Sequence, residues 1–312
     1  MDFGILADPV FFVQNVVDGL SRGALYSVFA MGFTLIFGVL DILNLAHAAT
    51  FMWGAFAGWL VMAKASMPLP VGLAAAMLAG AAIALALELI AFRPLRRAGA
   101  RAGADKLSPM ISSIGASLVM VSVAEAVFGV ETKRFPDRVL DPKPFLIGGI
   151  GGVRISRAQI LILAASVILV AVLGFFIRRT RIGKAIRAVA ASPRASLLLG
   201  IDVNSIIAIT FLVGGALAGA AGILVALLTN DIAPGMGGQI ELRGLAVVIL
   251  GGMGNIEGAV LGGFLLGLVE TFTIAYLPGG SDVKDAIAFL VIFLILLAKP
   301  DGILGKGKAE RG

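Results

Sequence analysis

The stretch RRTRIGKAIRAVAASPRASLLLG, residues 178–200, is basic and partly amphipathic, and a long apolar run flanks it on each side. Apolar runs of about 20 residues are long enough to cross a bilayer as helices. The stretch between them must therefore lie in water at one face of the membrane. Its lysines and arginines favour the cytoplasmic face. It predicts a protein that crosses the membrane several times, and it sets the orientation.

The composition agrees with a membrane protein. Of 312 residues, 59% are hydrophobic and 14% are charged, and the mean hydropathy is +1.02. Soluble domains average about 25% charged residues. The net charge of +6 does not indicate nucleic acid, because the basic residues lie between apolar runs. The absence of cysteine excludes disulfides and thiolate metal sites.

The apolar runs predict an all-α polytopic membrane protein with eight to nine transmembrane helices. The candidate spans are 11–39, 47–64, 71–92, 108–129, 159–177, 205–229, 256–277 and 284–299. A shorter run, 242–252, is interpreted as a broken or tilted helix and would be the ninth crossing. The first basic residue is Arg22, so the N-terminus lacks the charged region of a cleaved signal peptide. The first span is expected to remain in the mature protein.

Basic clusters set the expected orientation. The first cluster follows the third span and contains Arg93, Arg96, Arg97, Arg101 and Lys106. The second follows the fifth span and contains Arg178, Arg179, Arg181, Lys184, Arg187 and Arg194. The third follows the last span and contains Lys306, Lys308 and Arg311. All three are expected in the cytoplasm, which requires an even number of crossings after the second cluster and so favours nine. The N-terminus, with Asp2, Asp8 and Asp18, then lies outside.

The chain is expected to form a single transmembrane domain over residues 1–312. Residues 130–158 are its longest outer loop, an irregular or short hairpin region around Asp141–Pro144 and Gly148–Gly152. This loop is either a solvated connector or a contact for an outer partner. Glycines four residues apart, as at Gly215 and Gly219, indicate helices that pack closely in lipid.

The basic segment, residues 178–204, carries an apolar helical stripe at Ile182, Ala185, Ile186 and Val189. Ser192-Pro193 breaks this helix and can start a second one, with Ser192 as N-cap. Gly200 is a suitable left-handed cap for its end. The stripe would fit a groove on a partner, or rest on the bilayer as part of an ordinary inner loop. Helical spacing alone does not separate these interpretations.

Several motifs resemble the permease subunits of branched-chain amino-acid ABC transporters, and most closely their LivH-type branch. The basic segment is similar to the family signature G-(K/R)-A-x-R-A-x-A followed by A-x-L-L-G-I, at Gly183–Ala190 and Ala195–Ile201. Further resemblances cover nearly the whole chain in order, at Asn44–His47, Arg93–Arg96, Leu250–Ala259 and Lys299–Gly305.

The resemblance implies a permease subunit of an importer in the bacterial cell inner membrane. Its partners would be a second permease subunit, as a hetero- or homodimer, two cytoplasmic ATPase subunits and an extracytoplasmic substrate-binding protein. The residues that would couple to the ATPases are Gly183, Lys184, Ala185, Arg187, Ala188, Ala195, Leu199 and Gly200. ATP and magnesium would be bound by the partner subunits, because this chain has no G-x-x-x-x-G-K-(S/T) sequence. No enzymatic activity, cofactor or metal site is expected in this chain.

Polar residues within apolar spans are candidates for the gate or pathway, because charges in lipid cost several kcal/mol. The candidates are Asn44, His47, Gly252, Gly254, Asn255, Glu270, Glu125 and Arg22. His47 is interpreted as a packing residue at a helix break in preference to a gate. Glu125 and Glu270 are expected deep in their spans. Arg22 is the evident cation nearby, although the sequence assigns it no partner.

A weak signal for an internal repeat comes from the breaks at Asn44 and Asn255, which occupy comparable places between apolar spans. The cargo is expected to be a branched-chain or other small amino acid. The alternatives are an ABC permease for urea or short amides, an ion-coupled secondary transporter using Glu125, Glu270 and Arg22, and a channel-like facilitator. Gly183→Asp or Arg187→Glu is expected to abolish ATPase association.

Overall fold

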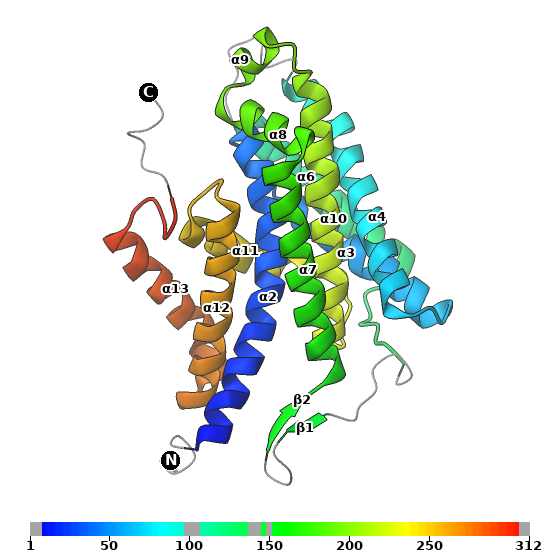
Figure 1. Ribbon diagram of the computed structural model, residues 1–312. Coiled ribbons are helices and arrows are strands. Elements are labelled where there is room, and N and C mark those ends of the chain that lie inside the picture. The colour runs from blue at the N-terminus through cyan, green and yellow to red at the C-terminus, as the bar shows by residue number, and fades with distance from the viewer. Residues whose placement is uncertain (1–7, 97–106, 137–144, 148–151, 306–312) are drawn as a thin grey trace.

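The computed structural model describes residues 8–96, 107–136, 145–147 and 152–305. Within these ranges the chain is almost entirely helical, and its sheet is a hairpin of β1 (Phe145–Ile147) and β2 (Val153–Ile155). Figure 1 shows the hairpin at the same end as the N-terminus, and the short helices α8 and α9 at the opposite end. These ends are called the hairpin end and the α8 end below.

Among the described residues, six helices are long and apolar enough to cross a membrane. They are α2 (Pro9–Leu40), α4 (Leu69–Leu87, continuing to Arg96 through the π-helical turn η2, Glu88–Phe92), α6 (Leu107–Phe128), α7 (Arg157–Arg179), α10 (Val203–Thr229) and α12 (Ile256–Tyr276). This confirms a polytopic all-α membrane protein.

Three further helices correspond to the remaining predicted spans. They are α3 (His47–Trp59, extended by the π-helical turn η1, Leu60–Lys64), α11 (Gly237–Gly251) and α13 (Gly280–Ala298). None of the three combines the length, the hydropathy and the low number of charged residues expected of a full span. The prediction of eight to nine crossings therefore depends on how many of them cross.

Local sequence signals explain where the helices begin. Helix α2 begins at Pro9, directly after Asp8. The Asp8 side chain caps the helix by accepting a hydrogen bond from the Val10 amide. Ser156 and Gln159 form a reciprocal capping box at the start of α7. Asp202 caps α10 and Asn255 caps α12 in the same way, through the amides of the first helical turn. These polar residues are the boundaries between the apolar runs.

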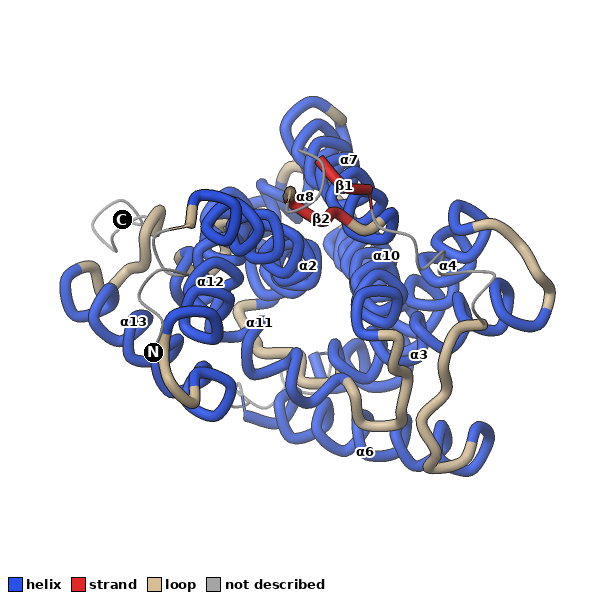
Figure 2. Tube along the Cα trace, turned by 90° about the horizontal axis from the view of Figure 1, so that it is seen from below, coloured by secondary structure: helices blue, strands red, loops and turns tan. Residues whose placement is uncertain are grey.

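The long helices form two groups. Helix α2 packs most extensively against α12, and α10 packs most extensively against α4. In Figure 2 these two pairs lie on opposite sides of the molecule, with α13 beside the first pair and α3 beside the second. We call them the α2–α12 group and the α10–α4 group. The groups also contact each other directly, through α2 and α10.

Glycines make the close approach within the second group possible. Gly219 of α10 lies against the backbones of α3 at Gly54 and of α4 at Ala76 and Gly80. A Cβ atom on Gly219 would collide with the Ala76 carbonyl. Backbones in lipid associate through such van der Waals contacts between small residues, because apolar burial gives little drive there. The prediction that these glycines serve internal packing is confirmed.

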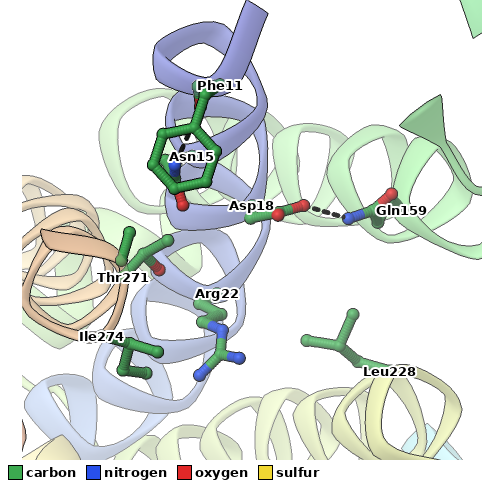
Figure 3. A pocket seen from close by; sticks show the side chains of 9 residues that line it. Phe11, Asn15, Asp18, Arg22, Gln159, Leu228, Thr271 and Ile274 are labelled. Carbon is green, nitrogen blue, oxygen red and sulfur yellow. Dashed lines mark hydrogen bonds between the residues drawn. The ribbon is translucent and has the colours of Figure 1, made fainter. Parts of the chain in front are cut away.

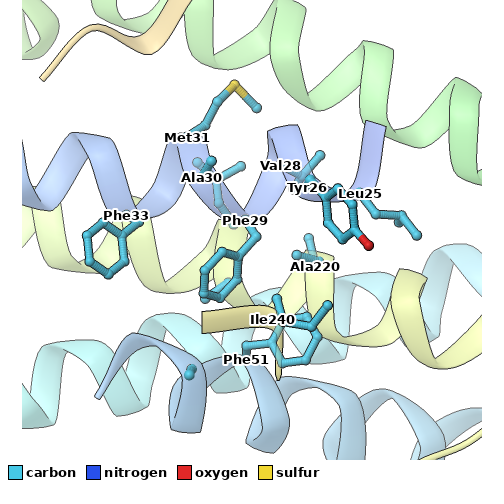
Figure 4. Close-up of a cluster of buried hydrophobic side chains, with 14 of the residues drawn as sticks. Leu25, Tyr26, Val28, Phe29, Ala30, Met31, Phe33, Phe51, Ala220 and Ile240 are labelled. Atoms are coloured by element: carbon cyan, nitrogen blue, oxygen red, sulfur yellow. The ribbon is translucent and has the colours of Figure 1, made fainter. Parts of the chain in front are cut away.

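The core lies where the two groups meet. Figure 4 shows Phe29 of α2, Phe51 of α3, Ala220 of α10 and Ile240 of α11 gathered there. The rings of Phe29 and Phe51 meet edge to face with centroids 5.6 Å apart, a favourable geometry for aromatic pairs. Helix α11 is thus part of the interior and not a surface element.

The order of elements is similar in two parts of the chain, α2 to α4 and α10 to α12, with opposite direction. Helix α2 runs from the hairpin end to the α8 end, and α10 runs back (Figure 1). Each is followed by a shorter helix, α3 or α11, and then by a long one, α4 or α12. Asn44 precedes the shorter α3, whereas Asn255 caps the long α12. The prediction that these two breaks occupy comparable places is therefore wrong.

Several sequence predictions fall outside the described residues. They concern Asp2, the basic residues Arg97, Arg101 and Lys106, the loop residues Asp141–Pro144 and Gly148–Gly151, and the C-terminal Lys306, Lys308 and Arg311. The described part of the 130–158 loop contains the hairpin. It also bridges Lys133 to Ile232, in the connection between α10 and α11.

Candidate functional site

The basic segment folds into two short helices, α8 (Arg181–Ala191) and α9 (Pro193–Leu198). Thr180 caps α8 by accepting a hydrogen bond of 3.0 Å from the Gly183 amide. Ser192 caps α9 through the Ala195 amide at 3.2 Å, and Gly200 has the left-handed φ of +79°. The predicted break, restart and end of this segment are confirmed.

Two residues of the α8 stripe face other helices of this chain. Ile186 and Val189 are buried, and α8 packs on α7, α2 and α10. Gly183 lies against the α7 backbone, where a Cβ atom would collide with the carbonyls of Phe176 and Ile177. This buried part of the stripe covers the ends of these apolar helices, whereas Ile182, at the start of the stripe, is 40% exposed. Gly183→Asp would therefore disturb the packing of α8 on α7, whether or not α8 contacts a partner.

The exposed apolar surface lies one helix further along the chain. Leu197, Leu198 and Leu199 are exposed by 59%, 89% and 79%. The three consecutive leucines lie at the end of the six-residue helix α9, which is too short to bury them all. This run was the sequence signal for the exposed surface. Of the other predicted coupling residues, Lys184, Arg187, Ala195 and Gly200 are exposed, whereas Ala185 and Ala188 are half-buried.

Asn44 and His47 shape the start of α3. The Asn44 carboxamide oxygen accepts a hydrogen bond from the Ala46 amide, 3.1 Å long. His47 is buried between the rings of Phe29 and Phe33, with centroids 5.0 and 5.6 Å away. It does not line the cavity around Arg22 that is described below. The geometry agrees with a packing role for His47.

The glycine-rich break between α11 and α12 is held by the chain's last described segment. The Ile303 and Leu304 amides donate to the carbonyls of Leu250 and Gly251, at 2.8 and 3.2 Å. The Asn255 carboxamide donates to the Leu304 carbonyl at 2.7 Å. Gly252 and Gly254 have positive φ angles of 101° and 85°, which favour glycine. Two motifs that are about 50 residues apart in sequence thus form one structural unit.

Glu270 is buried in a charged network that the sequence did not reveal. Its carboxylate lies 3.0 Å from Nε of Arg243 and accepts a hydrogen bond of 2.6 Å from the Tyr26 hydroxyl. Arg243 also donates to Asp285 at 2.9 Å. The network joins α2, α11, α12 and α13. Glu270 has its partner, and that partner is Arg243, a basic residue within the short apolar run of α11.

Glu125 is not deep in the protein. It is exposed in the last turn of α6, where its carbonyl accepts a hydrogen bond from the Gly129 amide. The expectation of a buried carboxylate at this position is wrong, because hydropathy finds a span without showing which face of it is covered. No ion pair joins Glu125 to Arg22 among the described residues.

Arg22 lies in a cavity of about 380 Å³. The cavity is bounded by α2, α7, α10 and α12, and its lining is Phe11, Asn15, Asp18, Arg22, Gln159, Leu228, Thr271, Ile274 and Ala275. Figure 3 shows the Arg22 guanidinium directed between Ile274 and Leu228, and Asp18 turned toward Gln159. This cavity unites one predicted pathway residue with eight that the sequence did not single out for that role.

The fold and this cavity are those of an integral membrane protein that crosses the membrane several times, with a partly polar cavity between its helix groups. A family model described as branched-chain amino acid transport system / permease component matches residues 15–296. The chain therefore belongs to this family of permease components.

Known relatives match the chain nearly end to end. The high-affinity branched-chain amino acid transport system permease protein BraD of Pseudomonas aeruginosa is 35% identical, over 96% of this chain and 98% of its own length. The permease protein LivH of Escherichia coli K12 is 29% identical, over 97% and 98%. The ribose import permease protein RbsC of E. coli K12 is 26% identical, over 93% and 86%.

Proposed function

We propose that this chain is the translocating subunit of a binding-protein-dependent ABC importer, and that its cargo is a branched-chain or related small amino acid. Membership of the permease family supports the class, and the end-to-end similarity to BraD and LivH supports the cargo. Separate ATPase subunits would drive alternating access, and ATP and magnesium would bind there. A second permease subunit and an external binding protein would complete the assembly.

The observation that carries the coupling role is the exposed tip of α9. Leu198 is 89% exposed although it is strongly apolar, and exposed Lys184, Arg187 and Arg194 lie in the same segment. Large apolar side chains exposed beside charges are typical of a surface that binds a protein. The tip, Leu197–Leu199, would enter the ATPase subunit, while buried Ile186 and Val189 would transmit its movement to α7, α2 and α10.

The proposed topology has nine crossings, with α3, α11 and α13 completing the count. The α8 end would be cytoplasmic and the hairpin end outside, in the cell inner membrane. The opposite directions of α2 and α10, and the swapped pairs α2–α12 and α4–α10, support an inverted internal repeat. In transporters of that kind the pathway lies between the repeats, which is where α2 meets α10.

The other candidate functions have less support. An ion-coupled transporter needs a carboxylate that can take up and release a proton, but Glu270 is tied to Arg243 and Tyr26. Similarity to a ribose import permease shows that relatives serve different solutes. Transport of urea or short amides therefore remains the alternative cargo within the same class.

The coupling role is tested by Leu198→Asp, with Val130→Asp as the matched control. Val130 is 76% exposed at the opposite end, just after α6. The chain is expressed together with candidate ATPase and binding-protein subunits from the same organism and purified through a tag on this chain. Leu198→Asp is expected to lose most of the co-purified ATPase, and the control is expected to keep it.

Uptake completes the test. Proteoliposomes holding the wild-type complex are expected to accumulate radiolabelled L-leucine only with ATP inside and binding protein outside. Co-purification unchanged by Leu198→Asp contradicts the role of the tip. The absence of any ATPase from the wild-type preparation contradicts the proposed class.

A further inference from the structure

We propose that the cavity around Arg22 is a membrane-embedded binding site for a zwitterionic α-amino acid. Arg22 would bind the α-carboxylate and Asp18 the α-ammonium group. This inference deepens the proposed function, on which it rests for the cargo class. It assigns the recognition to named side chains of the permease itself.

Arg22 is the first observation. It lies 13 residues after Pro9, hence about 20 Å along α2 at about 1.5 Å per residue. A charge at such a depth normally has a partner. The Arg22 guanidinium makes no ion pair or hydrogen bond with any described residue, and it points into the cavity. Such a group is suited to a carboxylate, which a guanidinium can bind through two parallel hydrogen bonds.

Asp18 is the second observation. It lies one helical turn from Arg22, a spacing at which opposite charges commonly pair. The two do not pair. The Asp18 carboxylate instead accepts hydrogen bonds from the amide groups of Gln159, at 2.6 Å, and Gln14, at 3.1 Å. These neutral donors fix its position and leave its charge uncompensated, so it can still accept from an ammonium group.

The positions of the two amides are themselves fixed. The Gln14 side-chain oxygen accepts a hydrogen bond of 2.8 Å from the Arg154 amide in β2. Gln159 belongs to the capping box of α7 through its own side-chain oxygen. The carboxylate is thus held by α7 and, through Gln14, by the hairpin. This arrangement keeps it apart from Arg22, four residues further along the same helix.

The remaining lining suits an aliphatic amino acid. Phe11, Leu228 and Ile274 provide an apolar wall, and Thr271 on α12 has a buried hydroxyl with no hydrogen-bond partner among the described residues. A volume of about 380 Å³ is within the ~300–1,000 Å³ typical of small-molecule pockets. Mostly apolar walls with a few placed polar groups are also typical of such sites.

The cavity lies at the junction of the two helix groups. Arg22 and Thr271 belong to the α2–α12 group, whereas Leu228 belongs to α10. A relative movement of the groups would change the distance between these walls. A ligand held there would therefore be exposed or enclosed as the transporter changes state.

The test uses the complete permease–ATPase complex in nanodiscs, without the binding protein. Millimolar L-leucine is expected to raise its unfolding temperature, since a ligand that binds the folded state stabilises it. Two probes each lack one charge: leucinamide has no carboxylate and 4-methylpentanoate has no ammonium group. Both are expected to give a much smaller shift than L-leucine at equal concentration. Equal shifts with all three compounds overturn the proposal.

Variants locate the binding. Arg22→Gln and Asp18→Asn are each expected to raise the L-leucine concentration for half-maximal stabilisation at least about tenfold, because each removes a charge-assisted hydrogen bond. The matched control is Arg134→Gln, an exposed arginine after α6 whose side chain does not line the cavity. It is expected to behave as wild type. Arg22→Lys, which keeps the charge, is expected to recover part of the affinity.

The outcomes separate this inference from the proposed function. If wild type imports L-leucine and Arg22→Gln does so with unchanged half-saturation and unchanged stabilisation, the zwitterion site is wrong and the importer stands. If the wild-type complex imports no branched-chain amino acid, the proposed function fails. Stabilisation by L-leucine that depends on Arg22 would then still support the site.

Discussion

Arg22 on α2 and Arg243 on α11 are both arginines within helices, and their surroundings are opposite. Arg243 contacts Glu270 at 3.0 Å, Asp285 at 2.9 Å and the Tyr26 hydroxyl at 3.3 Å. Arg22 has no comparable partner among the described residues and points into a cavity. The residue type is the same, so the difference lies in what the neighbouring helices bring to each charge.

The contrast indicates how polar residues in a membrane protein can be divided. A charge whose neighbours satisfy it, such as Arg243, holds helices together. A charge kept away from an available partner, as Arg22 is from Asp18, remains free for a ligand. Removing the first should therefore cost stability, and removing the second should cost binding.

The largest effect is expected for Arg243→Met. Glu270, only 1% exposed, would keep a buried charge without its partner, which destabilises proteins by about 3–5 kcal/mol. Arg22→Gln is the control and is expected to change stability by less than about 1 kcal/mol. Thermal or denaturant unfolding of the purified complex measures both. A large loss with Arg22→Gln would remove the distinction between the two arginines.

The double variant Arg243→Met with Glu270→Leu sharpens the same comparison. Replacing a buried ion pair by apolar residues is often neutral, so the double variant is expected to recover most of the stability lost by Arg243→Met. The measurement is the coupling free energy from a double-mutant cycle. Additive losses would show that Glu270 and Arg243 do not depend on each other.

A smaller effect is expected for Gly219→Val, on the α10 side of the molecule. The added side chain meets the backbone of α4 at Ala76, and overpacking of this kind costs about 1–3 kcal/mol. Gly174→Val on α7 is the control, because a Cβ atom there meets nothing within 4 Å. Similar unfolding temperatures for the two variants would contradict the close packing of α10 on α4.

Asp285→Asn is expected to have a weaker effect than any change at Glu270. Asp285 is the outer partner of Arg243 and its side chain is 51% exposed, and exposed ion pairs contribute about 0–1 kcal/mol. The measurement is the unfolding temperature at low and at high salt. A loss of stability as large as that of Arg243→Met would show that the exposed Asp285 contributes as much to the network as the buried Glu270.

The smallest effect is expected at Asp202, a carboxylate in water at the start of α10. Hydrogen bonds from the Ser205 side chain and amide lower its pKa below the ordinary 3.8. Its contribution is therefore present above the unfolded-state pKa and is lost as the pH falls through the lower, folded-state pKa. Hydrogen exchange in the first turn of α10 should rise over that acidic range, and Asp202→Asn should remove the pH dependence.

Local chemistry explains what could be predicted. Helix spans follow from runs of apolar residues, and the two short helices follow from Ser192-Pro193 and Gly200, whose effects reach only a few neighbours. Even α11, predicted as 242–252, was found at Gly237–Gly251. Helical spacing left open what the apolar stripe of α8 contacts, and the structure packs its Ile186 and Val189 on α7, α2 and α10.

The amino-acid order alone was enough for the membrane class, the helix boundaries and the family motifs, because each depends on neighbours along the chain. It could not pair Glu270 with Arg243 or separate Asp18 from Arg22. Those relations join helices far apart in sequence, and they depend on which faces meet when α2, α11 and α12 pack. Charge in lipid is costly wherever it lies, but whether a neighbour or a ligand satisfies it depends on this packing.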